Sequence, residues 1–328
     1  MNRLKLTPGL LSLALMAVMP TVTSAQSADT WPSRPIKLLI GYPPGGSIDI
    51  LSRGLAPGLS KVLGQPVVID NRPGAAQTLG AELLAKADPD GYTIGLIDSG
   101  PLTISPHLRA VPYDPFKSFV PVGSIANLPL VIIASNQAGI GSLADLVKGA
   151  RQTPGALSYA STGAGSMHNL TGEYLKSNLK LDMVHIPYRG TALAVPELLT
   201  GRVALSITGV SSGGRLILDK QVQAVGVTST KRSPAIPNVP TLAEQGVSGF
   251  DAQGWVGLLA PAGTPPPIVA KLGAALRVAL KEPAFIQQEV TKGGNELLAG
   301  TPEELGTMLA GDHARWGRII KEQGIKSE

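Results

Sequence analysis

The sequence predicts an α/β protein of two lobes, built on mainly parallel sheets, with a hinge between the lobes. The first observation is that short apolar runs alternate with segments of helical spacing over most of the chain, which is typical of α/β folds. The second is the length of 328 residues, because about 300 residues exceed what a single core usually holds. We therefore expect two lobes, each with its own sheet.

The expected elements follow from these two patterns. Apolar runs predict buried strands at Ile36–Ile40, Val67–Asp70, Thr93–Ile97, Val131–Ala134, Leu157–Ala160, Met183–Ile186, Val203–Ile207 and Val222–Val227. Helical spacing predicts helices at Ile48–Leu63, Thr78–Ala87, Leu143–Gln152, Met167–Asn178 and Ala192–Leu199. The run Thr301-Pro302-Glu303-Glu304 has the pattern of a capping box with proline at the first helical position. It predicts a terminal helix that reaches about Gln323.

Two passages rich in proline and glycine, 127–141 and 234–263, are candidate crossings between the lobes. With both as crossings, the chain leaves lobe one, builds lobe two and returns to lobe one. The expected boundaries are 30–130 for the first part of lobe one, 131–249 for lobe two, and 250–328 for the return segment.

Residues 1–25 are predicted to be an export signal. Arg3 and Lys5 form a positive start, Leu10–Val18 is a short apolar run, and Thr23-Ser24-Ala25 supplies the small residues of a cleavage site. The apolar run is shorter than the roughly 20 residues of a membrane span. We expect cleavage after Ala25 and release of a soluble, monomeric protein into the periplasm.

Composition excludes several classes of function. Without the signal the chain has 26 basic and 23 acidic side chains, dispersed along the sequence, which argues against a nucleic-acid surface. Aromatic residues make up only 4% of the chain, so stacking platforms for bases are not expected. There is no cysteine, so neither a disulfide framework nor a lipoprotein cleavage site exists.

The informative segments are glycine-rich loops that follow predicted strands and precede predicted helices. They are 41–47, 71–77, 161–166 and 187–191. A helix N-terminus offers unpaired N–H groups, and glycine lets a ligand approach the backbone closely. Ligands of open α/β sheets bind at this edge. The loops therefore predict an anion-binding cleft between the lobes, although each loop alone also fits an ordinary turn.

A carboxylate would be held there mainly by backbone N–H and hydroxyl groups around Gly46-Ser47 and Gly165-Ser166, because these loops contain no Lys or Arg. The loops are neither a P-loop nor a full dinucleotide fingerprint. No cofactor is expected.

One catalytic pattern competes with this interpretation. Gly209-Val210-Ser211-Ser212-Gly213 fits Gly-x-Ser-x-Gly, with Asp219 or Asp251 and then His313 downstream. Against a hydrolase, His313 falls within the predicted terminal helix, and Gly213-Gly214 suggests a plain flexible turn. The chain is therefore not expected to be an enzyme.

Metal binding is not expected either. His107, His168, His185 and His313 are scattered through the sequence, without a His-Glu-x-x-His spacing.

Several motifs, in order, resemble the substrate-binding proteins of tripartite tricarboxylate transporters, also called the Bug family. They are Trp31–Ile36, Tyr42–Asp49, Asn71–Ala75, Pro89–Thr93, Tyr159–Ser166, Pro187–Gly190, Val239–Glu244 and Ala260–Pro265. The resemblance implies a periplasmic binding-protein fold that closes around an organic acid and delivers it to membrane permease subunits.

The resemblance and the loops together select the candidate ligand-binding residues. These are Tyr42, Gly45, Gly46, Ser47, Asp49, Asn71, Gly74, Ala75, Gln77, Ser161, Gly163, Gly165, Ser166, Tyr188, Arg189, Gly190 and Thr191. The expected ligand is a mono- or dicarboxylate. A receptor that presents its ligand to a signalling partner, and a secreted hydrolase using Ser211, remain alternatives.

The sequence departs from the family pattern at several positions. Asn169 stands where histidine is common, with His168 one position earlier, Ala204 stands where aspartate is frequent, and Ala76-Gln77 replaces a glycine-richer pair. These differences prevent the transfer of any particular ligand.

Overall fold

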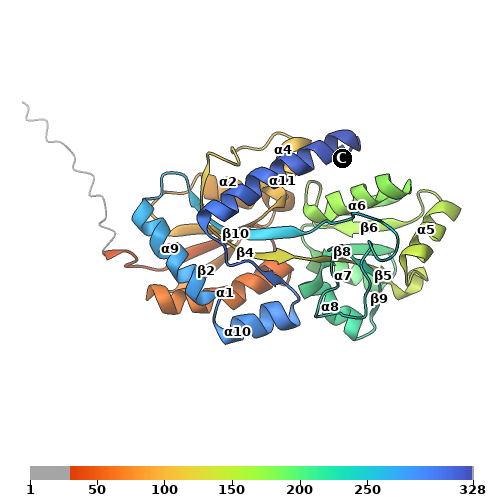
Figure 1. The fold of residues 1–328 in the computed structure, drawn as a ribbon, viewed down its shortest axis with the longest axis horizontal. Coiled ribbons are helices and arrows are strands. Elements are labelled where there is room, and N and C mark those ends of the chain that lie inside the picture. Colours follow the sequence, from red (N-terminus) through yellow and green to blue (C-terminus); the bar gives the residue numbers. More distant parts are fainter. Residues whose placement is uncertain (1–29, 327–328) are drawn as a thin grey trace, which may run out of the picture. The chain divides into compact units, whose positions relative to one another are not determined.

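A computed structural model describes residues 30–326, and the predicted signal and its cleavage site lie outside this part of the chain. Within it the strands form one six-stranded and one five-stranded sheet (Figure 1). The described residues from Pro32 onward belong to one compact unit.

The first sheet has the order β11-β4-β10-β3-β1-β2. Its strands are β1 (Ile36–Ile40), β2 (Val67–Asn71), β3 (Thr93–Asp98), β4 (Phe119–Leu128), β10 (Gly254–Pro261) and β11 (Glu296–Leu297). The accompanying helices are α1 (Ser47–Leu63), η2 (Ala75–Gln77), α2 (Thr78–Ala85), α3 (Gly100–Thr103), α4 (Ser105–Leu108), α9 (Pro266–Ala279), α10 (Pro283–Phe285) and the π-helix η4 (Ile286–Lys292). We call this body the first lobe.

The second sheet has the order β7-β6-β8-β5-β9. Its strands are β5 (Leu130–Ser135), β6 (Ser158–Ser161), β7 (Val184–Pro187), β8 (Leu205–Gly209) and β9 (Val222–Val227). The accompanying helices are η3 (Asn136–Ala138), α5 (Leu143–Gln152), α6 (Met167–Leu179), α7 (Thr191–Leu199) and α8 (Val210–Leu218). This body is the second lobe.

The predicted two-lobed α/β class is confirmed, but the sheets are mixed rather than mainly parallel. Strand β1 pairs in parallel with β2 and β3, whereas β10 is antiparallel to β3 and β4. In the second sheet, β6 is parallel to β7 and β8, and β5 is antiparallel to β8 and β9. The antiparallel strands are those by which the chain leaves or re-enters a sheet.

The crossing passages contain more regular structure than the sequence suggests. Strand β4 of the first sheet ends at Leu128 and β5 of the second begins at Leu130, so the first crossing is made at Pro129. Within the second passage, Gly254–Pro261 is the fully buried strand β10, because its apolar run outweighs its glycine and proline content. The predicted residue boundaries of the lobes stay predictions.

The segment that resembles a flexible turn is helix α8. Gly213 lies inside this helix, and a side chain there would begin 2.6 Å from Thr208 Cγ2 of β8. Glycine is therefore required for close packing of helix on strand, and the prediction of a plain turn at Gly213-Gly214 is wrong.

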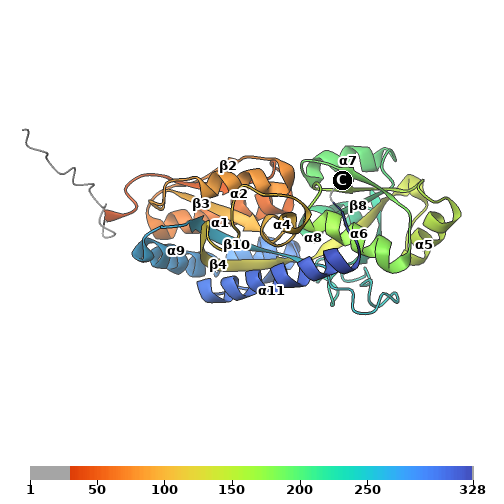
Figure 2. The same cartoon turned by 90° about the horizontal axis from the view of Figure 1, so that it is seen from above.

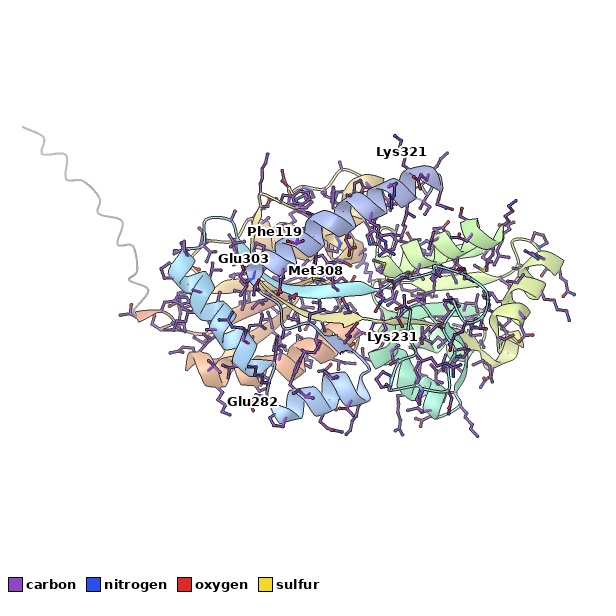
Figure 3. The ribbon with its side chains drawn as sticks, in the orientation of Figure 1. Phe119, Lys231, Glu282, Glu303, Met308 and Lys321 are labelled. Carbon is purple, nitrogen blue, oxygen red and sulfur yellow. The ribbon has the colours of Figure 1, made fainter. Side chains whose placement is uncertain are left out.

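The terminal helix α11 (Pro302–Glu322) has the predicted capping box between Thr301 and Glu304. Figure 3 labels Glu303 and Lys321 at its opposite ends, where their charges complement the helix dipole. Figures 1 and 2 show α11 running along both lobes. Leu305 and Leu309 belong to the core of the first lobe, and Trp316 packs in the core of the second.

Candidate ligand-binding site

The N-termini of α1, α7 and α8 meet at a cavity between the lobes. A side chain at Gly46, before α1, would begin 3.7 Å from Thr191 Oγ1 of α7, and one at Gly209, before α8, would overlap Ser47 Oγ. The Ser47 hydroxyl also donates to Ser212 Oγ of α8, at 3.1 Å. First-lobe and second-lobe helix ends are therefore in direct contact.

These helix ends offer backbone donors. No side chain in the described structure caps α1, α7 or α8 at its preceding glycine. The first N–H of α8, that of Val210, donates to the Pro129 carbonyl at 3.0 Å, so the donors at the cavity come mainly from α1 and α7. The N–H groups of a first helical turn have no partner within the helix, and the helix dipole favours an anion there. The arrangement can accept a carboxylate shared between the lobes.

The N-terminus of α6 is different, because several N–H groups of the loop before it and the Asn169 N–H are already bonded. Ser166 Oγ accepts from the Asn169 N–H, and Asn169 Oδ1 accepts from the Gly165 N–H. The Gly163 N–H donates to Ser161 Oγ, at 3.0 Å. This loop reaches the cavity through Thr162, Met167 and His168, and the predicted residues Ser161, Gly163, Gly165 and Ser166 lie behind them.

The carboxyl end of β3 places an acid in the cavity. Asp98 is buried, and its Oδ2 accepts from the Tyr42 hydroxyl at 2.8 Å while Oδ1 accepts from the Gly100 N–H at 3.0 Å. Burial raises the pKa of Asp98 to about 6, although both hydrogen bonds act in the opposite direction. Burial and the Asp98 charge raise the pKa of Tyr42 well above its usual value.

His168 supplies a neutral imidazole beside this acid. Its Nδ1 lies 3.0 Å from Thr162 Oγ1, and burial lowers the pKa of His168 to about 4. An imidazole with that pKa carries no charge near neutral pH, so His168 does not attract an anion electrostatically.

The remaining wall of the cavity is mostly apolar. Its volume is about 30 Å³, and its apolar lining consists of Pro43, Ile48, Leu128, Leu130, Met167 and Ala192. The buried Ser99 hydroxyl also lines it and has no hydrogen-bond partner among the described residues. The cavity has room for about two waters, so an organic acid can enter it only if the lobes move apart from this arrangement.

Asp49 and Asn71 shape the first loop from behind. The Asp49 carboxylate accepts from the Gly45 N–H, from Arg53 and from Asn71 Nδ2, and Asn71 also donates to the Tyr42 carbonyl. Burial alone would raise the pKa of Asp49, but these hydrogen bonds outweigh it and lower the pKa. The structure therefore gives both residues a role in loop geometry.

The loop after β2 is held in an unusual conformation. Ala75, Ala76 and Gln77 have φ values of 48°, 52° and 68°, in the left-handed region, which costs on the order of 1–3 kcal/mol for each such residue. The Gln77 amide bonds the Leu96 carbonyl and the Asp98 N–H. Gln77 thus positions the end of β3, and Gly74 and Ala75 lie outside the cavity lining.

The loop after β7 divides into two parts. Gly190 and Thr191 line the cavity, and a side chain at Gly190 would begin 2.7 Å from Pro43 Cγ of the opposite lobe. Tyr188 packs instead against the small cluster around Ala160. Arg189 is exposed and is not part of the lining.

Sequence reasoning missed Asp98, Ser99 and Gly254. Asp98-Ser99 directly follows the predicted strand Thr93–Ile97, so its place at the end of a strand is the signal that could have identified it. Gly254 begins the unpredicted strand β10, and a side chain there would begin 3.5 Å from Ser99 Oγ.

No hydrogen bond in the described structure joins the residues of the hydrolase alternative. Ser211 Oγ is buried without a partner in residues 30–326. His313 Nδ1 lies 3.0 Å from the Leu102 carbonyl, and Asp219 pairs with Arg215. The Asp251 carboxylate accepts from Gln253 Nε2. This geometry does not favour a catalytic triad.

The histidines are less scattered in space than in sequence. The rings of His107 and His313 lie 4.2 Å apart. Among the described residues, however, no group of three or more His, Asp or Glu side chains is placed to hold a metal ion.

Two α/β lobes with helix N-termini around a shared cavity define a solute-binding protein. The model of the tripartite tricarboxylate transporter family receptor matches residues 51–325. The chain belongs to this family, as its motifs predict.

Known proteins support this assignment along nearly the whole chain. Protein BugT of Bordetella pertussis is 34% identical over 307 residues, covering 93% of this chain and 94% of BugT. The structure of the periplasmic binding protein BugD superposes with a TM-score of 0.87 at 33% identity, covering 91% of this chain and 100% of BugD. R. palustris Rpa4515, solved with adipate, has a TM-score of 0.86 at 32% identity, covering 90% of this chain and 99% of Rpa4515.

Proposed function

We propose that this protein binds a small organic carboxylate in the periplasm and delivers it to membrane permease subunits. The observation that carries the proposal is the convergence of uncapped helix N-termini from both lobes on one cavity. A ligand bridging them would favour the closed form over the open one. The adipate in Rpa4515 shows that a protein of this fold accepts such a molecule.

We propose that the carboxylate is held by the backbone N–H groups in the first turns of α1 and α7 and by the Thr191 hydroxyl. The Ser47 hydroxyl can join them only if it gives up its hydrogen bond to Ser212. Charge-assisted hydrogen bonds contribute roughly 1.5–3 kcal/mol each, and helix dipoles add to them. The predicted partner loop at Gly165-Ser166 contributes less in this proposal, because its donors are already bonded. Arg189 is exposed and contributes least.

Substitution of Gly46 by valine tests this grip. Gly46 has φ −85° and ψ 169°, which valine adopts without strain, but its branches would fill the space beside Thr191 Oγ1. We expect Gly46→Val to weaken carboxylate binding at least roughly tenfold, or about 1.4 kcal/mol. Isothermal titration calorimetry with the strongest ligand from a thermal-shift screen of aliphatic and aromatic carboxylates measures the change.

The matched control is Gly311→Val, on the exposed side of α11, where a new side chain meets nothing within 4 Å. It should bind like the wild type. Unchanged binding by Gly46→Val, with the control also unchanged, would refute the grip.

We further propose that the protein is exported, cleaved after Ala25 and monomeric, and that it catalyses nothing. No helix within residues 30–326 is long and apolar enough to cross a membrane. The intact mass of the periplasmic form, starting at Gln26, tests the cleavage. Ester hydrolysis that is lost in Ser211→Ala would instead favour the hydrolase.

Loss of ligand uptake on deletion of this protein would support delivery to a permease. A signalling role remains the alternative: normal uptake together with a lost transcriptional response would favour it.

A further inference from the structure

The charges in the cavity suit one ligand carboxylate and not two. Neither Lys nor Arg is among the described residues that line it, whereas Asp98 is. The guanidinium of Arg53, near the α1 end, is bonded to Asp49. A second ligand carboxylate would therefore enter an apolar wall without a cation to balance it, which is unfavourable.

Asp98 occupies the place where a second ligand carboxylate would need a positively charged partner. A side chain at Gly100 would begin 3.3 Å from Asp98 Oδ1 and 3.5 Å from the Met167 backbone nitrogen, at the first turn of α6. The protein's own carboxylate thus lies beside the N-terminus of α6. At this helix end Ser166 accepts from the Asn169 N–H, and the Asp98 carboxylate is an anion of the protein itself in the same region.

The surroundings of Asp98 extend this difference between the two ends. Met167 and Leu128 line the cavity. A side chain at Gly254 would begin 3.5 Å from Ser99 Oγ and 3.8 Å from Met167 Cγ, so Ser99 and Met167 lie close together there. At the other end, Ser47, Thr191 and Gly209 surround the uncapped helix N-termini. One end of the cavity fits an anion, and the other fits an apolar or hydrogen-bond-donating group.

We propose that the ligand is a monocarboxylate with an apolar body, its carboxylate at the N-termini of α1 and α7 and its body directed toward Asp98 and Met167. This inference rests on the proposed function. It also distinguishes the protein from Rpa4515, which was solved with a dicarboxylate.

Pairs of acids with the same chain length test the inference. Calorimetry at neutral pH compares hexanoate with adipate, and 4-methylbenzoate with terephthalate. We expect the monocarboxylate of the better-binding pair to bind at least roughly tenfold more tightly than its dicarboxylate. Tighter or equal binding of the dicarboxylate would overturn the inference while leaving the proposed function intact. Binding of neither acid, together with no response to other carboxylates, would overturn the proposed function itself.

Asp98→Asn tests the role assigned to the acid. The amide oxygen can still accept from the Gly100 N–H, and the amide nitrogen can donate to the Tyr42 hydroxyl oxygen, but the negative charge is gone. The dicarboxylate should therefore gain affinity, and the ratio within a pair should fall several-fold. Circular dichroism and the melting temperature establish that the variant is folded. A folded variant with an unchanged ratio would contradict the role of Asp98. The wild-type comparison needs no variant and decides the substrate class by itself.

Discussion

Glu289 is a buried carboxylic acid outside the ligand cavity. Only 1% of the residue is exposed, and neither carboxylate oxygen has a hydrogen-bond partner in the described part of the chain. It lies in the π-helix η4, where its Oε1 is 3.1 Å from the position a side chain at Gly54 of α1 would take. Burial raises the pKa of Glu289 from 4.5 to about 7.

This raised pKa predicts a loss of stability as the pH rises. Between about pH 4.5 and pH 7 the folded protein holds a proton on Glu289 that the unfolded chain has released, so the free energy of unfolding falls as pH increases. Glu289→Gln removes this contribution. From the difference in pKa, the effect is about 3 kcal/mol at most.

Chemical denaturation of wild type and variant across this range measures the difference. The free energy of unfolding of Glu289→Gln should rise relative to that of the wild type as pH increases. Glu322→Gln, at an exposed position near the end of α11, gives the background. Parallel pH profiles of wild type and Glu289→Gln would show that burial does not hold the proton.

At the scale of single residues, the sequence identified the cavity residues at the N-termini of α1 and α7 better than those around Asp98. Tyr42, Gly46, Ser47, Gly190 and Thr191 line the cavity and were predicted from glycine-rich loops. Asp98 was not predicted as a cavity residue, because its loop is not glycine-rich. Whether a loop's N–H groups are free or already bonded, as at Gly165, depends on side chains that composition does not place.

At the scale of elements, strands and helices were predictable where the apolar residues of a segment followed a single period, that of a strand or that of a helix. The observed β1 and β9 begin and end at the predicted residues. Strand β10 and helix α8 were missed because glycine and proline suggested turns there. In α8, Gly213 instead permits close contact with β8, a reason visible only once the partner strand is known.

The contact between α1 and α8 makes a prediction at this scale. Gly209 has φ −66° and ψ 146°, so alanine fits the backbone, but its methyl group would overlap Ser47 Oγ. Gly209→Ala should keep the lobes slightly apart and weaken ligand binding roughly tenfold, or about 1.4 kcal/mol.

Calorimetry of Gly209→Ala is compared with that of Gly306→Ala in α11, where a side chain meets nothing within 4 Å. The control should bind as the wild type does. If Gly209→Ala also binds normally, the α1–α8 contact is not part of ligand-induced closure.

At the scale of the whole described molecule, the site exists only because the two lobes meet. Ser47 and Thr191 come from different sheets, and their proximity depends on the crossings at Pro129 and 228–253 and on α11, which packs in both cores. Local patterns predict which loops bind an anion. They cannot predict that α1, α7 and α8 converge while the loop before α6 bonds to itself.

A crystal structure of the protein with its tightest-binding carboxylate tests the proposed site most directly. We expect carboxylate oxygens about 3 Å from backbone nitrogens in the first turns of both α1 and α7, with the rest of the ligand against Met167 and Asp98. A carboxylate bound by the Arg189 guanidinium, or one lying outside the cavity between the lobes, would contradict it.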